Sequence, residues 1–167
     1  AQEDGCQVLG RYPADKYRVT TAEVIGALAG VCPSVPVAAL ALLKQVVFAY
    51  LSCNGDAHAK NFSIRRLSDG EWRATPAYDL PTTHLYRDHT MALSINGRHK
   101  ENIGREDFKA LGAAVGLRPR AVDRALDDLR ARVDLWLGDL DTLPFDGRRI
   151  HKLLKAIEYR RDRLAPR

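Results

Sequence analysis

The run VAALALLKQVVFAYLS at residues 37–52 constrains the fold more than any other stretch of the chain. Apolar residues fall on nearly every side of a helical wheel drawn through it, a pattern that does not favour an amphipathic surface helix or a half-exposed strand. Its length suits about four helical turns. The run therefore predicts a helix buried in the core, followed by a polar loop that begins at CNGD, residues 53–56.

The chain has 167 residues, of which 46% are apolar and 28% charged, which suits a single folded domain over residues 1–167. It contains no run of about 18 uncharged apolar residues and no basic and apolar leader, so we expect no membrane span and a cytoplasmic protein. Cys6, Cys32 and Cys53 are odd in number and far apart. They fit neither a disulfide framework nor a zinc motif, and we expect reduced, mostly buried thiols.

The remaining pattern predicts a mainly α fold (α+β) with a small β element. Residues 22–36 indicate a short helix that ends at Gly30 and the following prolines. β-branched and aromatic residues on both sides of Ser68-Asp69-Gly70 indicate a hairpin. Further along, we expect a strand at MALSI (91–95), helices at 105–117 and 118–140, and a basic closing helix from Arg148 to Arg167.

Polar residues crowd into the loop NGDAHAKNFSI, residues 54–64, directly after the buried helix. Asp56 and Asn61 stand five residues apart, and Asp79 follows the predicted hairpin in TPAYDLP. In phosphoryl transfer, an aspartate accepts the proton of the attacking hydroxyl, an asparagine five residues later binds magnesium, and a second aspartate binds magnesium again. The order of elements therefore predicts a phosphotransferase. The other interpretation is structural: Asp56 would cap a helix, and Asn61 would satisfy the hydrogen bonds of a turn.

Three segments together resemble the HipA-like serine/threonine kinases, the toxins of bacterial toxin–antitoxin pairs. GDAHAKNFSI resembles the catalytic loop of that family, TPAYDLP its magnesium-binding segment, and QEDGCQVLGRYPADKY the stretch that opens its large helical lobe. The resemblance runs from Gln2 to the final helix and implies a protein-kinase-like large lobe. One departure is Gly5, where the family implies a large apolar residue.

The resemblance implies a role for each polar residue of the loop. Asp56 would be the catalytic base, and Asn61 and Asp79 would be magnesium ligands, as hard oxygen donors suit Mg²⁺. Lys60 would either offset charge on the transferring phosphoryl group or pair with one of the two aspartates. His58 would orient the loop by hydrogen bonds, because the position of the base is already filled.

The same resemblance implies ATP and Mg²⁺ as cofactors and a protein serine or threonine as acceptor, often on an aminoacyl-tRNA synthetase. A DNA-binding antitoxin of the HipB type would be the partner, with nucleic acid bound only indirectly through it. The chain contains no glycine-rich GxGxxG loop. We therefore expect that the N-terminal nucleotide lobe is absent from this chain, which would bind ATP weakly and phosphorylate little by itself.

Other classes of protein compete with this interpretation. Small-molecule phosphotransferases of the aminoglycoside or choline kinase type share the Asp-x4-Asn loop, but usually carry His where this chain has Asn54. Lipid kinases normally show Asp-Phe-Gly near the position of Asp79. Residues 105–133 also imitate a helix-turn-helix DNA-binding module, in which Arg118, Arg120 and Arg124 would read bases if their face is exposed. The same pattern suits two packed helices of a kinase lobe.

The formal net charge is +5, and the segment from Arg148 to Arg167 carries much of the excess. Such a stripe can attract phosphate groups. It can also be the solvated face of a closing helix. The buried face of that helix would consist of Ile150, Leu153, Leu154, Ile157 and Leu164.

Overall fold

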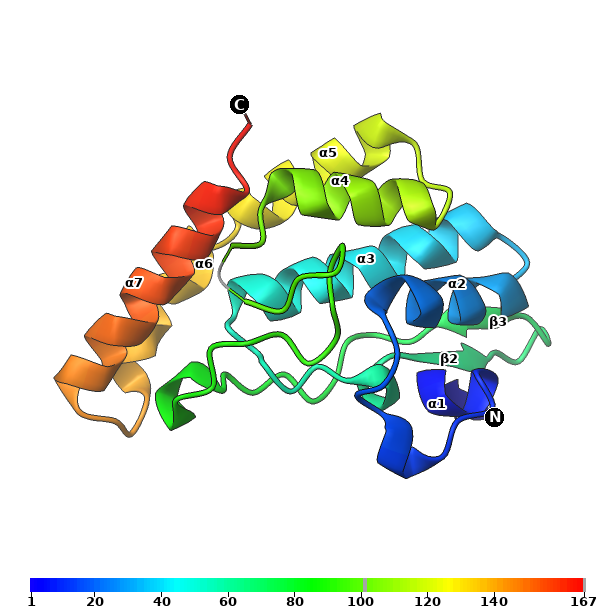
Figure 1. Ribbon diagram of the computed structural model, residues 1–167, viewed down its shortest axis with the longest axis horizontal. Coiled ribbons are helices and arrows are strands. Elements are labelled where there is room, and N and C mark those ends of the chain that lie inside the picture. The colour runs from blue at the N-terminus through cyan, green and yellow to red at the C-terminus, as the bar shows by residue number, and fades with distance from the viewer. Residues whose placement is uncertain (101, 167) are drawn as a thin grey trace.

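The computed structural model describes residues 1–100 and 102–166 and is mainly helical, with a small three-stranded sheet (Figure 1). The predicted fold class is confirmed. Arg167, the end of the predicted basic segment, lies outside the described residues. The helices and strands are, in chain order, β1 (Gln2–Asp4), α1 (Gly5–Val8), α2 (Thr21–Val31), α3 (Val35–Leu51), β2 (Ser63–Arg66), β3 (Trp72–Ala74), α4 (Arg105–Ala114), α5 (Pro119–Ala131), α6 (Asp134–Leu137) and α7 (Gly147–Arg163). Short 3-10 turns lie at η1 (Pro13–Asp15), η2 (Ala59–Asn61), η3 (His84–Tyr86) and η4 (Gly138–Thr142).

Helix α3 is the centre of the core, as the apolar run predicted. It contacts α2, α5, α7 and β3, and in Figure 1 it crosses the middle of the molecule beneath α4 and α5. Its inward-facing side chains, among them Leu42, Leu43 and Tyr50, are fully buried. Pro36 lies in the first turn of α3, where its missing N–H has no partner to lose. The helix before it, α2, ends at Val31, one residue beyond the expected stop.

The predicted hairpin is present, and a third strand joins it. β2 pairs with β3 around the predicted turn, while β1 pairs antiparallel with β2 through Glu3 and Ile64. The sequence did not predict β1, because Gln-Glu-Asp carries none of the residues that favour strands. This pairing places the start of the chain beside the strand that follows the polar loop.

Gly5 corrects one expectation from the family resemblance. It is buried, and a Cβ built on it would lie 2.6 Å from the carbonyl oxygen of Ala59 and 3.0 Å from Cγ1 of Val24. The Gly5 N–H donates to the carbonyl of Phe62 at 3.0 Å. A large apolar side chain therefore has no space at this position, and glycine lets the first turn of α1 pack directly on the polar loop.

Two predicted elements are wrong. Residues 91–95 form no strand: the segment makes only an isolated bridge, between Ile95 and Arg98, although Leu93 and Ile95 are buried as in a strand pattern. The predicted helix 118–140 is also broken, since α5 ends at Ala131 and the chain continues into α6 and η4. Tertiary packing accounts for this break, because the break places Trp136 against Phe48, with 6.4 Å between ring centroids.

The closing helix α7 buries the predicted face. Its buried apolar residues are Ile150, Leu153 and Ile157, followed by Leu164, while Leu154 is partly buried. Cys6, Cys32 and Cys53 are free and buried, as predicted, and burial raises the pKa of each thiol. Among the described residues, no helix combines the length and the apolar character needed to cross a bilayer.

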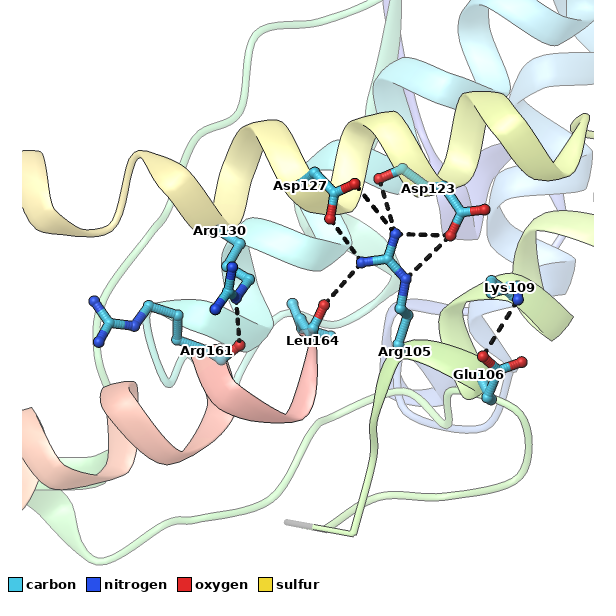
Figure 2. Close-up of polar contacts among 8 residues, drawn as sticks. All are labelled: Arg105, Glu106, Lys109, Asp123, Asp127, Arg130, Arg161 and Leu164. Atoms are coloured by element: carbon cyan, nitrogen blue, oxygen red, sulfur yellow. Dashed lines mark hydrogen bonds and ion pairs between the residues drawn. The ribbon is translucent and has the colours of Figure 1, made fainter. Parts of the chain in front are cut away.

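The buried guanidinium of Arg105 joins α4, α5 and the end of α7 (Figure 2). It donates to Oδ1 of Asp123 at 2.7 Å, to Oδ1 of Asp127 at 2.7 Å and to the carbonyl of Leu164 at 2.9 Å. Phe108 of α4 and Leu126 of α5 are fully buried. The helices of the possible helix-turn-helix therefore pack into the core as parts of one lobe. Arg118, which precedes α5, and Arg120 and Arg124 within it are exposed.

We predict that Arg105→Ala lowers the free energy of unfolding by about 1–3 kcal/mol, because it removes charge-assisted hydrogen bonds from a buried position. Lys109→Ala is the matched control on the same helix, where Lys109 makes only a surface ion pair with Glu106 at 3.2 Å. That change should stay within about 0.5 kcal/mol. Urea unfolding at neutral pH measures both. Equal losses in the two variants would show that Arg105 does not join the helices.

Candidate functional site

The polar loop begins where α3 stops, and the stop has a defined geometry. The N–H of Cys53 donates to the carbonyl of Tyr50 at 3.2 Å, and the N–H of Asn54 donates to that of Ala49 at 2.9 Å. This pair of bonds is a Schellman motif, which needs a left-handed residue after the helix. Cys53 occupies that position with φ 57°, although glycine is the usual residue. A buried helix end thus fixes the direction in which the loop leaves the core.

Asp56 is partly exposed and is held from two sides. Its N–H donates to Oδ1 of Asn54 at 3.0 Å, and one carboxylate oxygen, Oδ1, accepts a 2.6 Å hydrogen bond from the hydroxyl of Tyr17. The hydrogen bond to Asp56 raises the pKa of Tyr17, so the phenol stays protonated and keeps donating. Among the described residues, no hydrogen bond reaches Oδ2 of Asp56. That oxygen is available to a ligand.

Asn61 and Asp79 lie in direct contact, although 18 residues separate them in the sequence. Nδ2 of Asn61 donates to Oδ2 of Asp79 at 2.6 Å. The N–H of His58 donates to Oδ1 of Asn61 at 3.0 Å, and this bond fixes which end of the Asn61 amide faces Asp79. Asn54 adds a 3.3 Å hydrogen bond from Nδ2 to the carbonyl of Asp79. The structure therefore brings together the loop that carries Asp56 and the segment that carries Asp79.

Lys60 and His58 lie in the same loop in different surroundings. Lys60 is partly exposed, and within the described residues its ammonium group has no carboxylate within 4 Å, so it is not paired with Asp56 or Asp79. His58 is buried and packs edge-on against Tyr17, with 5.3 Å between centroids. Burial lowers the pKa of its imidazole. Its orienting hydrogen bonds run through the backbone N–H, while Nδ1 has no partner among the described residues.

The oxygen atoms of Asn61 and Asp79 are a reasonable donor set for Mg²⁺, which usually takes one or two protein ligands and keeps waters and phosphate oxygens. Oδ1 of Asn61 uses one lone pair for the N–H of His58 and has a second one left. Asp79 is exposed and has a left-handed backbone with φ 52°, and its carboxylate contacts Asn61. No group of three His, Cys, Asp or Glu side chains suited to a metal occurs among the described residues.

Comparison with known proteins identifies the family. The model described as "HipA-like C-terminal domain" matches residues 1–137. The chain belongs to the HipA-like C-terminal domain family. Two Sinorhizobium fredii (strain NBRC 101917 / NGR234) relatives are named "Putative kinase Y4mE", 31% identical over 93% of this chain, and "Putative kinase Y4dM", 29% identical over 85% of it.

A solved structure confirms the HipA-like fold. The chain superimposes with a TM-score of 0.81 and 22% identity on a chain from the Shewanella oneidensis MR-1 complex of HipA, HipB and operator DNA, over 98% of its own length. It spans 43% of that chain, and 40% and 36% of the two Sinorhizobium relatives. This HipA-like chain therefore corresponds to less than half of each of these longer proteins.

Sequence reasoning missed three residues that position the HipA-like loop. Tyr17 reaches Asp56 from the segment after η1, Asn54 bridges Asp56 and Asp79, and Thr83 accepts the N–H of Gly55 at 2.8 Å. The sequence distinguishes Asn54 only as a departure from the aminoglycoside and choline kinase type. Tyr17 and Thr83 carry no local signal, because each acts across more than 25 residues of sequence.

We predict that Gly55→Ala destabilises the protein by about 1–3 kcal/mol through overpacking. Its Cβ would lie 2.6 Å from Oγ1 of Thr83, 2.7 Å from Oδ2 of Asp88 and 2.9 Å from the carbonyl of Thr90. Gly26→Ala is the matched control, since nothing lies within 4 Å of its Cβ in α2, and it should stabilise by about 0.5–1 kcal/mol. Thermal unfolding measures both. Similar changes of melting temperature in the two variants would contradict the packing described here.

Proposed function

We propose that this chain is the catalytic large lobe of a HipA-like kinase, which transfers the γ-phosphate of ATP to a serine or threonine of a protein. The observation that carries the proposal is the 2.6 Å contact between Asn61 and Asp79, made by the loop that also holds Asp56. Asn54 links the other two elements of the proposed site, because its side chain accepts the N–H of Asp56 and donates to the carbonyl of Asp79, which supports a shared site for Asp56, Asn61 and Asp79. Membership of the HipA-like family and the names of the Sinorhizobium relatives support the same chemistry.

In this proposal, Asp56 is the general base. Its free oxygen, Oδ2, takes the proton of the acceptor hydroxyl as the hydroxyl oxygen bonds to the γ-phosphorus and the bond to the β-phosphate oxygen breaks. Tyr17 is a positioning residue, because its hydroxyl holds Oδ1 of Asp56 at 2.6 Å and so limits rotation of the carboxylate. His58 keeps the loop in shape through its backbone N–H and its contact with Tyr17.

Asn61 and Asp79 would hold Mg²⁺, which when bound neutralises charge on the nucleotide phosphates. The contact between them pre-arranges both side chains before any ligand arrives. Lys60 is free of carboxylate partners among the described residues, which supports its role toward the transferring phosphoryl group over a structural ion pair.

We further propose that residues 1–167 act as a single domain and bind ATP weakly by themselves. Their buried apolar residues form one continuous cluster that runs from Cys6 to Leu164, which supports a single unit. A DNA-binding antitoxin of the HipB type is the proposed partner, because the structural neighbour was solved in a complex of HipA, HipB and operator DNA. We propose an aminoacyl-tRNA synthetase as the acceptor protein, as the family resemblance implies. We also propose a cytoplasmic location.

We predict that Asp56→Asn and Asp79→Asn each lower kcat by at least about 100-fold in the natural full-length protein. Asparagine keeps the shape of both side chains but removes the charge that accepts a proton or binds a cation. Asp128→Asn, an exposed position on α5, is the control and should leave kcat unchanged. Transfer of labelled phosphate from ATP to protein acceptors measures the effect, and circular dichroism checks the fold. Full activity in Asp79→Asn would remove Asp79 from the site, and transfer to a sugar or choline in place of protein would overturn the proposed acceptor class.

We predict that Tyr17→Phe lowers kcat by about 10-fold and leaves KM for ATP unchanged. A misplaced Asp56 carboxylate would slow the transfer step but would not weaken the binding of the nucleotide. The phenyl ring keeps the contact with His58 while the hydrogen bond to Asp56 is lost. Tyr12→Phe is the control, since Tyr12 is 79% exposed. If both variants keep the wild-type kcat, Tyr17 does not position the base.

A further inference from the structure

A basic cleft lies between the loop around η3 and the first turns of α7. Its volume is about 390 Å³, a size typical of ligand sites, and it is separate from the pocket that includes Asn61 and Asp79. The basic or imidazole side chains that line it are His84, Arg87 and His89 from the loop, and Arg148, Arg149 and Lys152 from α7.

Positive charge in the cleft is in excess. Asp146 is the acidic residue of the lining, and it is already used: its Oδ2 lies 3.3 Å from Nε of Arg149, and its Oδ1 caps α7. Arg87, Arg148 and Lys152 have no carboxylate within 4 Å among the described residues. Several cations that repel one another around one cleft favour an anionic ligand.

The floor of the cleft is held in place from inside the core. Buried Arg160 of α7 donates to the carbonyl of His89 at 3.0 Å, and Nδ1 of His89 lies 2.8 Å from Nδ1 of His84. Burial, together with the nearby His89, Arg160 and Lys152, lowers the pKa of His84 to about 4. At neutral pH His84 is therefore uncharged and offers a hydrogen bond, while the flanking arginine and lysine side chains supply charge.

The cleft continues into a basic stripe and carries aromatic rings at its edge. Arg148, Lys152, Lys155 and Tyr159 are spaced four, three and four residues apart, so they share one exposed face of α7 that is about 16 Å long. Tyr86 stands between the lining residues Leu85 and Arg87 and is 72% exposed. Its ring packs edge-on against Phe145, which precedes Asp146.

We propose that this cleft and the α7 stripe bind single-stranded nucleic acid, with the basic side chains on the phosphodiester backbone and Tyr86 stacked on a base. The length of the stripe suits a chain of phosphates better than one phosphate group. An exposed aromatic ring beside a basic groove suits unstacked bases, which a duplex does not offer. This contact is direct, unlike the antitoxin-mediated contact expected from the family resemblance. It does not depend on phosphoryl transfer.

The test is fluorescence anisotropy of the chain with labelled single-stranded RNA and DNA of mixed sequence. We expect Arg148→Glu combined with Lys152→Glu to weaken binding by about 10-fold or more, and to reduce the slope of log K against log salt by about 1.4, or about 0.7 for each lost phosphate contact. Arg120→Glu combined with Arg124→Glu on the exposed face of α5 is the control, with the same change of net charge. It should stay within about twofold of wild type, and an equal loss there would overturn the assignment to the cleft.

Three further measurements decide the class of ligand. Tyr86→Ala should weaken binding by about fivefold or more without changing the salt slope, because stacking involves no counterion release. No loss in Tyr86→Ala, or equal competition by polyglutamate, pyrophosphate or duplex DNA, would overturn single-strand recognition. NMR of wild-type protein gives a readout that does not require a folded variant. The ring resonances of His84 and His89 should shift on addition of the oligonucleotide, and unchanged resonances would overturn the site.

Discussion

The end of α3 inside the core is the constraint on which the arrangement around the candidate site depends. Arg160, a buried residue of α7, donates to the carbonyl of Tyr50 at 2.8 Å across 110 residues of sequence. A cation at the C-terminal carbonyls of a helix is favoured by the helix dipole, and here carbonyl groups compensate a charge that has no ion-pair partner within 4 Å among the described residues. The hydroxyl of Tyr50 then donates to Ile103 at 2.8 Å. The point at which the polar loop leaves the core is thus fixed by the last helix and by the segment that leads into α4.

From that point the loop is shaped by backbone conformations that few side chains adopt. Cys53 and Asp79 both have positive φ, one at the start of the loop and one in the segment that returns to it. Such conformations cost about 1–3 kcal/mol each and persist only where surrounding contacts impose them. At Cys53 the contacts are the bonds to the carbonyls of Tyr50 and Ala49, and at Asp79 they include the bond from Nδ2 of Asn54 to its carbonyl. A rigid, polar, partly open loop on a buried helix is the kind of support that a base and cation ligands need.

One loop serves both the candidate site and the basic cleft. Thr83 accepts the N–H of Gly55 and donates to the carbonyl of Cys53, while the next residue, His84, lines the cleft. Helix α7 is divided in a similar way. Its apolar face and Arg160 belong to the core, and its opposite face carries the exposed cations. The predicted apolar face is buried, and whether the basic face attracts phosphate groups or is only solvated stays a matter for the proposed binding test.

The sequence by itself determined the elements whose cause is local. Apolar residues on nearly every side of 37–52 predicted a buried helix, and the turn residues Ser68 to Gly70 predicted the hairpin. The spacing of Asp56 and Asn61, together with the position of Asp79 after the hairpin, made these three residues candidates. Tertiary structure decided what depends on partners far along the chain. Tyr17 reaches Asp56 across 39 residues, β1 exists only because β2 accepts it, and 91–95 forms no strand because no second strand pairs with it among the described residues. Helix and turn preferences act within a few residues, whereas hydrogen bonds and packing between distant segments exist only after the chain has folded.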